Sequence, residues 1–268
     1  MTDYEGVNLE VHRAHSARMY DYFLGGVTNF AADREAAGKV KAVLPFAELS
    51  ARVNRAFMHR STRALAEAGL DQFLDVGTGI PTSPNLHEIA QRVNRSARVV
   101  YVDNDPIVLA HAKALLIGTP EGRTAYVQAD VTDAAALLAS AQLQEALDFS
   151  RPIALSLNAL LHFVPDECGA HGIVEQLKGA LVSGSALVMS HATEDFAPAE
   201  IARALQIYRS AGTQVQARSR AEFERFFTGW ELAAPGVVPS PRWRPDGAGP
   251  HGVSDEQASV YAAVALKP

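Results

Sequence analysis

The sequence contains a single cysteine, Cys168, among its 268 residues. An intramolecular disulfide is therefore excluded, and so is a metal site built from several thiolates. The nine histidines show no paired spacing of the His-Glu-x-x-His kind, so we predict no metal site. The Gly-x-Ser-x-Gly nucleophile elbow and the Gly-x-x-x-x-Gly-Lys-Ser/Thr phosphate loop are also missing, which removes the commonest hydrolase and phosphate-loop nucleotidase classes.

Positive charge is also scarce, since 24 Lys and Arg stand against 30 Asp and Glu and give a net charge of −6. Because nucleic-acid binding needs concentrated Lys and Arg, this balance favours a small-molecule or protein partner and argues against nucleic acid. No apolar run reaches the roughly 20 residues that a membrane-spanning helix requires. The N-terminus lacks the basic start and apolar run of a signal peptide, so we expect a cytoplasmic protein with no membrane contact.

Strand-like and helix-like patterns alternate from about residue 70 onward. Strands are predicted over 72–76, 98–102, 124–129, 152–157 and 185–190, and helices over 107–116, 134–147, 167–181, 198–210 and 219–227. Such alternation indicates a parallel sheet. Segments 230–232 and 259–266 are strand-like and should form a terminal hairpin. The predicted fold class is a Rossmann-like α/β fold with a mostly parallel, seven-stranded sheet and an antiparallel C-terminal strand.

Residues 9–68 carry helical periodicity instead, and Gly69 suits the end of a helix over 57–68. We therefore predict an N-terminal helical cap or lid over residues 1–68, followed by the Rossmann-like domain over 69–268. The two parts are expected to form one compact unit.

The first predicted strand ends in an acidic residue and two closely spaced glycines, Asp75, Gly77 and Gly79, with Thr78 between the glycines. Glycine adopts backbone angles closed to other residues and lets a ligand approach the main chain. A strand that runs into such a turn is typical of a nucleotide-like cofactor pocket.

The second predicted strand also ends in an acidic residue, Asp103, which follows Gly77 by 26 positions. A carboxylate at about this spacing typically accepts hydrogen bonds from ribose hydroxyls. Dinucleotides and S-adenosylmethionine both carry that ribose. A pyrophosphate site requires a third glycine and a helix N-terminus directly after it. Here Pro81 and Pro84 delay the start of the helix, and this favours S-adenosylmethionine over a dinucleotide. The third strand ends at Asp130 and Val131, which we expect to recognise the adenine amine, with Asn104 flanking the ring.

Several longer segments resemble the actinobacterial S-adenosylmethionine-dependent methyltransferase family once catalogued as a domain of unknown function. The resemblance spans nearly the whole chain and is carried by 17–26, 29–34, 74–85, 101–105, 162–166 and 241–245. It implies a class I methyltransferase fold with S-adenosylmethionine as cofactor. Together with the charge balance, this leads us to expect an unidentified small-molecule acceptor. It supplies neither the acceptor nor the oligomeric state.

Two residues after the fourth strand are candidates for the approach to the methyl group. Asn158 could contact the cofactor, or it could cap the following turn. His162 is our candidate catalytic base, since a His or carboxylate near the methyl can accept a proton from an oxygen or nitrogen nucleophile. The alternative is a histidine packed in the core.

Tyr20 and Tyr22 are predicted to contact the cofactor from the N-terminal cap, where aromatic faces could meet a sulfonium by cation–π attraction. Aromatics at helical spacing are more often core residues, but Gly25, Gly26 and Asn29 are poor choices for an ordinary helix interior. Two other functions stay open at this stage. One is a non-catalytic S-adenosylmethionine-binding or interaction protein, and the other is an NAD-dependent oxidoreductase.

Overall fold

A computed structural model describes residues 11–115 and 117–268. The predictions that fall on residues 1–10 and 116 lie outside the described residues. The strands are β1 Gln72–Val76, β2 Arg98–Asp103, β3 Arg123–Gln128, β4 Ala154–Asn158, β5 Ala186–Ala192, β6 Glu231–Leu232, β7 Val238–Pro239 and β8 Val260–Leu266. Each predicted strand is present within two residues of its expected bounds at either end, and the short β7 is an addition.

Within the described chain these strands form one eight-stranded sheet in the order β3-β2-β1-β4-β5-β8-β6, with β7 also paired to β8. Strands β1 to β5 pair in parallel, while β8 runs antiparallel to β5, β6 and β7. The predicted mostly parallel sheet with an antiparallel C-terminal strand is confirmed, with eight strands in place of seven. Its order reverses between β1 and β4, and the carboxyl ends of strands beside such a reversal form a crevice suited to ligands.

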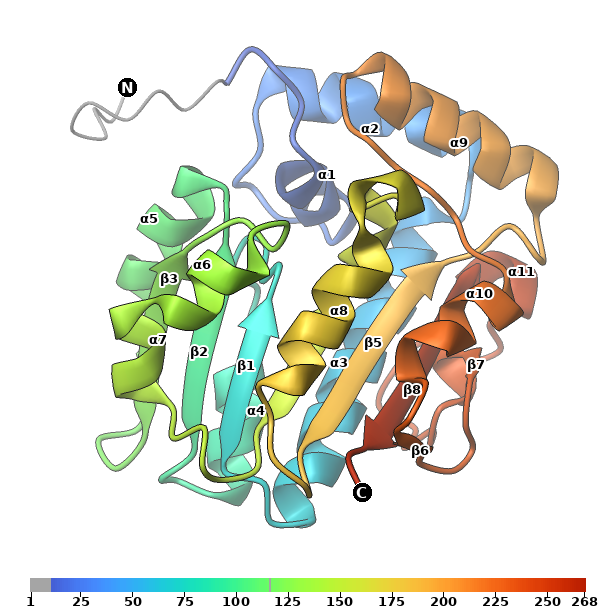
Figure 1. Cartoon of the computed structure of the whole chain (residues 1–268). Helices are drawn as coiled ribbons and strands as arrows, with labels where there is room; N and C mark the ends of the chain where they lie inside the picture. Colours follow the sequence, from blue (N-terminus) through green and yellow to red (C-terminus); the bar gives the residue numbers. More distant parts are fainter. Residues whose placement is uncertain (1–10, 116) are drawn as a thin grey trace.

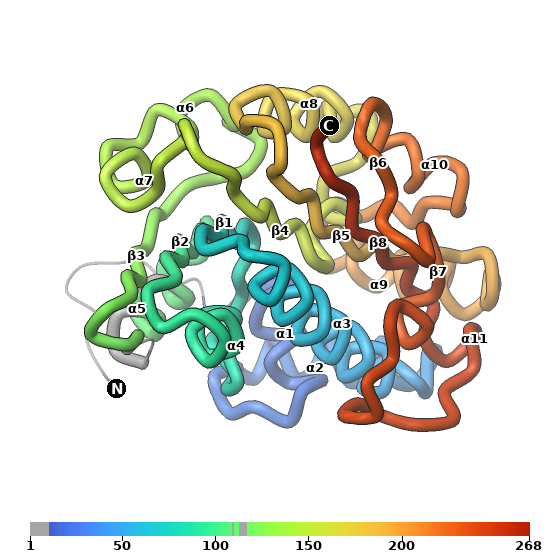
Figure 2. Tube along the Cα trace, turned by 90° about the horizontal axis from the view of Figure 1, so that it is seen from below, coloured from blue at the N-terminus to red at the C-terminus, as the bar shows by residue number. Residues whose placement is uncertain are grey.

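Helices cover both faces of the sheet (Figure 2). The helices are α1 Ser16–Phe23, α2 Ala31–Val43, α3 Ala47–Glu67, α4 Leu86–Val93, α5 Pro106–Leu115, α6 Ala134–Ala139, α7 Ala141–Ala146, α8 Ala170–Gly179, α9 Pro198–Ser210, α10 Arg220–Glu224 and α11 Asp255–Ala258. Helices α3 and α4 lie on one face, and α6, α7 and α8 on the other. Two apolar clusters, one on each face, contain inward side chains such as Phe57 and Leu155, both fully buried.

Three predicted helices are shorter than expected because the backbone leaves helical geometry inside them. The helix predicted over 134–147 breaks at Ser140, whose ψ of 124° is extended. The helix predicted over 167–181 begins only after Gly169, whose φ of 82° ends the preceding turn. The one predicted over 219–227 passes from α10 into a 3₁₀ turn, Arg225–Phe227.

Helices α1, α2 and α9 lie together over the carboxyl ends of the parallel strands (Figure 1). Buried polar contacts fix the turn between α1 and α2. Asp33 accepts hydrogen bonds from the His15 and Phe30 N–H groups, and the Asn29 amide donates to Asp21 over 2.8 Å. A Cβ on Gly26 would lie only 2.0 Å from Asp21, so this glycine serves close packing of the cap.

Candidate functional site

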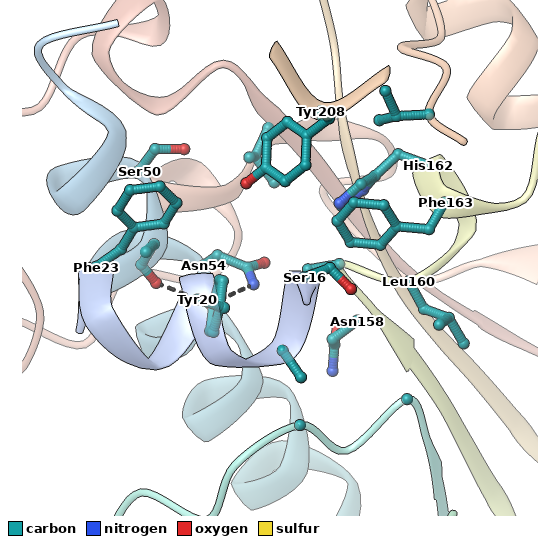
Figure 3. A pocket seen from close by; sticks show the side chains of 18 of the residues that line it. Ser16, Tyr20, Phe23, Ser50, Asn54, Asn158, Leu160, His162, Phe163 and Tyr208 are labelled. Carbon is teal, nitrogen blue, oxygen red and sulfur yellow. Dashed lines mark hydrogen bonds between the residues drawn. The ribbon is translucent and has the colours of Figure 1, made fainter. Parts of the chain in front are cut away.

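A cavity of about 250 Å³ lies between the strand ends and the helices above them. Its volume lies slightly below the range of roughly 300–1,000 Å³ that small-ligand pockets occupy. Figure 3 shows side chains from both sides pointing into it, with Asn158 on the strand side and Phe23, Ser50 and Tyr208 on the helix side. The predicted residues Asp75, Gly77, Thr78 and Gly79 line it, and so do Asp103, Asn104, Val131, Asn158, Tyr20 and His162.

The loop after β1 is held in a turn that both glycines require. Gly77 and Gly79 have φ values of 73° and 68°, where other residues are strained. The Gly77 and Thr78 N–H groups both donate to the Val102 carbonyl, which ties the loop to the end of β2. A Cβ on Gly77 would lie 2.6 Å from Leu160, whereas one on Gly79 would meet no protein atom within 4 Å. Gly79 thus leaves open space where a ligand can approach the backbone.

Asp103 holds the two neighbouring loops together. The Gly79 N–H donates to its Oδ2 over 2.8 Å and the Asp105 N–H to its Oδ1 over 3.0 Å. Burial raises the pKa of Asp103, although these two N–H groups act in the opposite direction. A carboxylate has about four lone-pair sites, so each oxygen can still accept a further hydrogen bond from a ligand.

Asp75 is the second carboxylate of the cavity. Burial raises its pKa to about 6, although the Ser156 hydroxyl, which donates to Oδ1 over 2.8 Å, and the nearby Arg55 guanidinium act against that shift. Asp75 is therefore close to half ionised near pH 6, and a cationic ligand group beside it would stabilise the charged form.

Arg55 was missed in the sequence because it comes from α3, in a region with no motif. Its guanidinium donates to the carbonyls of Thr82 and Pro84 in the loop after β1, and its Nε is buried with no partner among the described residues. Burial lowers the pKa of Arg55, while Asp75 is among the groups that oppose the shift. Arg55 and Asp75 together place one positive and one negative group in the strand-side part of the cavity.

Asn158 stands at the end of β4. Its amide donates to the Ser156 hydroxyl over 2.8 Å, while its Oδ1 is buried without a partner in the described chain. A buried acceptor left unpaired is costly, so a ligand that donates to it would be favoured.

His162 lies in the 3₁₀ turn Leu161–Phe163 after β4, and its ring stands 4.3 Å from the Phe163 ring, centroid to centroid. Burial, with a smaller contribution from the Arg218 guanidinium, lowers the pKa of His162 to about 3. Its Nδ1 is buried and has no partner in the part of the chain described. The imidazole is therefore neutral at physiological pH and offers hydrogen bonding without charge.

Arg218 fixes the position of His191, whose ring packs against the His162 ring. Its guanidinium donates to the Leu161 and Val164 carbonyls and forms an ion pair with Asp166 over 2.6 Å. The same guanidinium lies 2.6 Å from His191 Nε2, which must accept because arginine only donates. The Arg218 charge adds to the effect of burial in disfavouring a positive charge on the neighbouring His162.

The two cap tyrosines have different positions. Tyr20 lines the cavity, and its hydroxyl donates to the Ala51 carbonyl and accepts from the Asn54 amide, as Figure 3 shows. Tyr22 does not line this cavity and instead packs beside Lys41, whose ammonium lies 5.6 Å from the ring centroid. The structure therefore brings only Tyr20 to the site.

Asp130 also differs from Asp103 in its position. It lies between the lining residues Ala129 and Val131 but does not itself line the cavity. Its carboxylate accepts from the Thr132 N–H and hydroxyl and from the Asn104 amide; despite the opposing effect of burial, these bonds lower its pKa. Contact between Asp130 and a ligand stays a prediction.

The described residues offer neither a metal site nor a membrane-spanning helix. No cluster of three or more His, Cys, Asp or Glu side chains is arranged to hold a metal ion. None of the described helices combines the length and apolar character that crossing a membrane demands.

Comparison with known proteins decides the family. A family model described as S-adenosyl methyltransferase matches residues 3–268. The chain belongs to this S-adenosyl methyltransferase family. The resemblance predicted from the sequence motifs is thereby confirmed. No curated protein matches the sequence.

Two solved structures of actinobacterial proteins are similar over their whole length. A DUF574 family protein from Streptomyces avermitilis has a TM-score of 0.95 at 50% identity, covering 97% of this chain and 100% of that chain. A "putative methyltransferase" from Thermobifida fusca has a TM-score of 0.90 at 39% identity, covering 99% of both chains.

The plantazolicin methyltransferase BpumL, solved in complex with S-adenosylhomocysteine, has a TM-score of 0.52 at 11% identity, covering 94% of this chain and 95% of that chain. That similarity shows a class I methyltransferase-like fold.

Proposed function

We propose that this family member transfers a methyl group from S-adenosylmethionine to a small-molecule acceptor. The observation that carries the proposal is the convergence of Asp75, Gly79 and Asp103 on one cavity, at the sheet edge where the strand order reverses. The side chains there fit the cofactor, because the cavity offers a carboxylate for a ribose, an open glycine backbone and one group of each charge for an amino-acid zwitterion.

In this proposal each lining residue has a binding role. Asp103 accepts hydrogen bonds from the ribose hydroxyls, and Asn104 and Val131 flank the adenine. Asp75 faces the methionine ammonium, and the buried, unpaired Nε of Arg55 is available for the methionine carboxylate. Tyr20 and Asn158 border the path to the methyl group.

The cofactor, when bound, supplies an electrophilic methyl group on a sulfonium. The chain's contribution is to orient the acceptor against that methyl and to exclude water, which can supply most of the rate enhancement of an in-line displacement. The helices above the cavity provide the exclusion. His162 is placed to orient an acceptor's O–H or N–H as a neutral hydrogen-bonding partner.

The loop after β1 argues against a dehydrogenase. Helix α4 begins at Leu86, seven residues after Gly79, so no helix N-terminus stands directly behind the second glycine to hold a pyrophosphate. A non-catalytic S-adenosylmethionine-binding protein would share the cavity. Methylated product formed from a metabolite extract with labelled cofactor would exclude that alternative.

The proposal is tested by calorimetric titration with S-adenosylmethionine, S-adenosylhomocysteine and NADH, using wild type, Gly79→Ala and Gly229→Ala. Both glycines have positive φ, 68° and 79°, and neither would bring a new Cβ within 4 Å of another atom. Their strain costs should match at about 1–2 kcal/mol. Only Gly79 lines the cavity, so we expect Gly79→Ala alone to weaken S-adenosylhomocysteine binding, by about tenfold.

Two results of this titration would contradict the proposal. NADH binding without binding of either sulfur compound would make the dehydrogenase the better assignment. Equal losses in Gly79→Ala and Gly229→Ala would mean that backbone strain, and not the cavity, controls affinity.

His162 is expected to stay neutral between pH 5 and 8, because burial and Arg218 lower its pKa to about 3. An imidazole with the ordinary pKa of 6.5 would titrate in the middle of that interval. The measurement is a pH titration of the ¹³C-labelled imidazole signals, with the His162 resonance assigned from its loss in His162→Gln. A midpoint above pH 5 for that signal would show that His162 is able to act as a base near neutral pH.

A further inference from the structure

The cavity extends away from the strand ends into a space bordered by helices, which we call the helical chamber. It is defined by Phe23 of α1, Val40 of α2, Leu44 after it, and Ile201, Leu205 and Tyr208 of α9. In Figure 3, Phe23 and Tyr208 stand across the cavity from Asn158. The chamber is continuous with the proposed cofactor site, so it is the space left for an acceptor.

Charge is confined to the other side of the cavity. Of the described residues that line it, Arg55, Asp75 and Asp103 carry the carboxylate and guanidinium groups, and all three are bonded to the loops or strands at the sheet edge. His15, which also lines the cavity, lies 3.2 Å from Asp105 at the same edge. Burying an ion without a partner is very costly, so an acceptor in the helical chamber must be uncharged.

The polar groups that border the helical chamber are neutral, and they include both hydrogen-bond donors and acceptors. Asn54 Oδ1 is a buried acceptor with no partner in the described chain. The Tyr208 hydroxyl makes no hydrogen bond to the described residues, and burial raises the pKa of Tyr208, so it stays a donor. His162 adds a neutral imidazole beside Phe163. A hydroxyl both donates and accepts, and it therefore matches this set better than an ether, which only accepts.

We propose, on the basis of the proposed function above, that the methyl acceptor is an uncharged, mainly apolar small molecule whose reacting group is a hydroxyl, bound in the helical chamber. In the transfer an O–CH₃ bond forms as the S–CH₃ bond breaks. The electron pair of the broken bond stays on sulfur, which loses its positive charge. The hydroxyl proton passes to solvent.

The experiment uses protein saturated with S-adenosylhomocysteine and three probes of nearly equal shape: 2-naphthol, 2-naphthoate and 2-naphthylmethylammonium. We expect calorimetry to show 2-naphthol binding at least about tenfold more tightly than either ion, because only the ions must be desolvated without a partner. Equal binding of either ion, or no binding of 2-naphthol at millimolar concentration, would overturn the inference.

The place of binding is tested with Leu205→Trp and its neighbour Gln206→Trp. Leu205 is 8% exposed and lines the helical chamber, whereas Gln206 is exposed on the same helix, so the second variant controls for the new side chain. We expect Leu205→Trp alone to weaken 2-naphthol binding by about tenfold or more, with S-adenosylhomocysteine affinity within about twofold of wild type. Unchanged 2-naphthol binding in a Leu205→Trp protein that retains S-adenosylhomocysteine would place the probe elsewhere.

The two proposals fail in different ways. If only the inference about the acceptor is wrong, wild type will bind S-adenosylhomocysteine normally but will show no preference for the neutral probe. Failure of wild type to bind S-adenosylhomocysteine at all would overturn the proposed function itself.

Discussion

Asp103→Ala is expected to weaken S-adenosylhomocysteine binding by about 100-fold or more. A hydrogen bond to a charged group contributes about 1.5–3 kcal/mol, and two ribose hydroxyls would each donate one to this carboxylate. Their joint loss of about 3–6 kcal/mol corresponds to roughly 10²- to 10⁴-fold in affinity. The measurement is calorimetric titration of wild type and Asp103→Ala with the same ligand at pH 7.5.

Asp130→Ala is the comparison variant, because Asp130 follows the neighbouring strand β3 and also accepts local hydrogen bonds, from the Thr132 N–H and hydroxyl and from the Asn104 amide. Since its carboxylate does not line the cavity, we expect at most one hydrogen bond to the ligand to be lost, or about 2- to 10-fold. Thermal unfolding of both variants reports how much each loop is loosened. Equal affinity losses in the two variants would mean that Asp103 is not the ribose partner.

The strand-side half of the cavity could be predicted from the sequence because its geometry is set locally. Asp75 and Asp103 each lie at the carboxyl end of an apolar strand, and parallel neighbours must present these ends at the same edge. The structure adds what no spacing rule contains: the Asp103 carboxylate is tied to the Gly79 N–H, so the two motifs form one unit. The glycine pair is likewise explained only in three dimensions, since Gly77 is packed against Leu160.

The helix-side half could not be predicted, because its residues come from helices whose positions depend on long-range packing. Asn54 and Tyr208 lie in ordinary amphipathic patterns, and nothing local separates them from exposed neighbours. Tyr20 and Tyr22 illustrate the difficulty, since both are cap aromatics but only Tyr20 turns to the cavity. The packing of α2 against α9, which closes the chamber, joins segments more than 150 positions apart.

The affinity for S-adenosylhomocysteine is expected to fall about tenfold between pH 7 and pH 5, because burial raises the pKa of Asp75 to about 6. Below that pH the carboxylate is protonated and no longer attracts the ligand's ammonium, which stays charged throughout this interval. In Asp75→Asn this part of the pH dependence should vanish. An unaltered pH dependence in Asp75→Asn would show that Asp75 does not face the ammonium.

The same substitution should stabilise the ligand-free protein, by an amount that depends on pH. The pKa of Asp75 is raised from its ordinary value of 3.8, so the folded protein holds the proton more tightly than the unfolded chain does. The ionised carboxylate therefore destabilises the fold fully above about pH 6, and this cost disappears as pH falls to about 4. Asp75→Asn removes the cost while keeping an oxygen that can accept from Ser156. We expect a gain on the order of 2 kcal/mol at pH 7, or several degrees in Tm, and almost none at pH 4. A variant that is less stable than wild type at pH 7 would show that the ionised carboxylate stabilises the empty site, so that affinity and stability are not opposed at this residue.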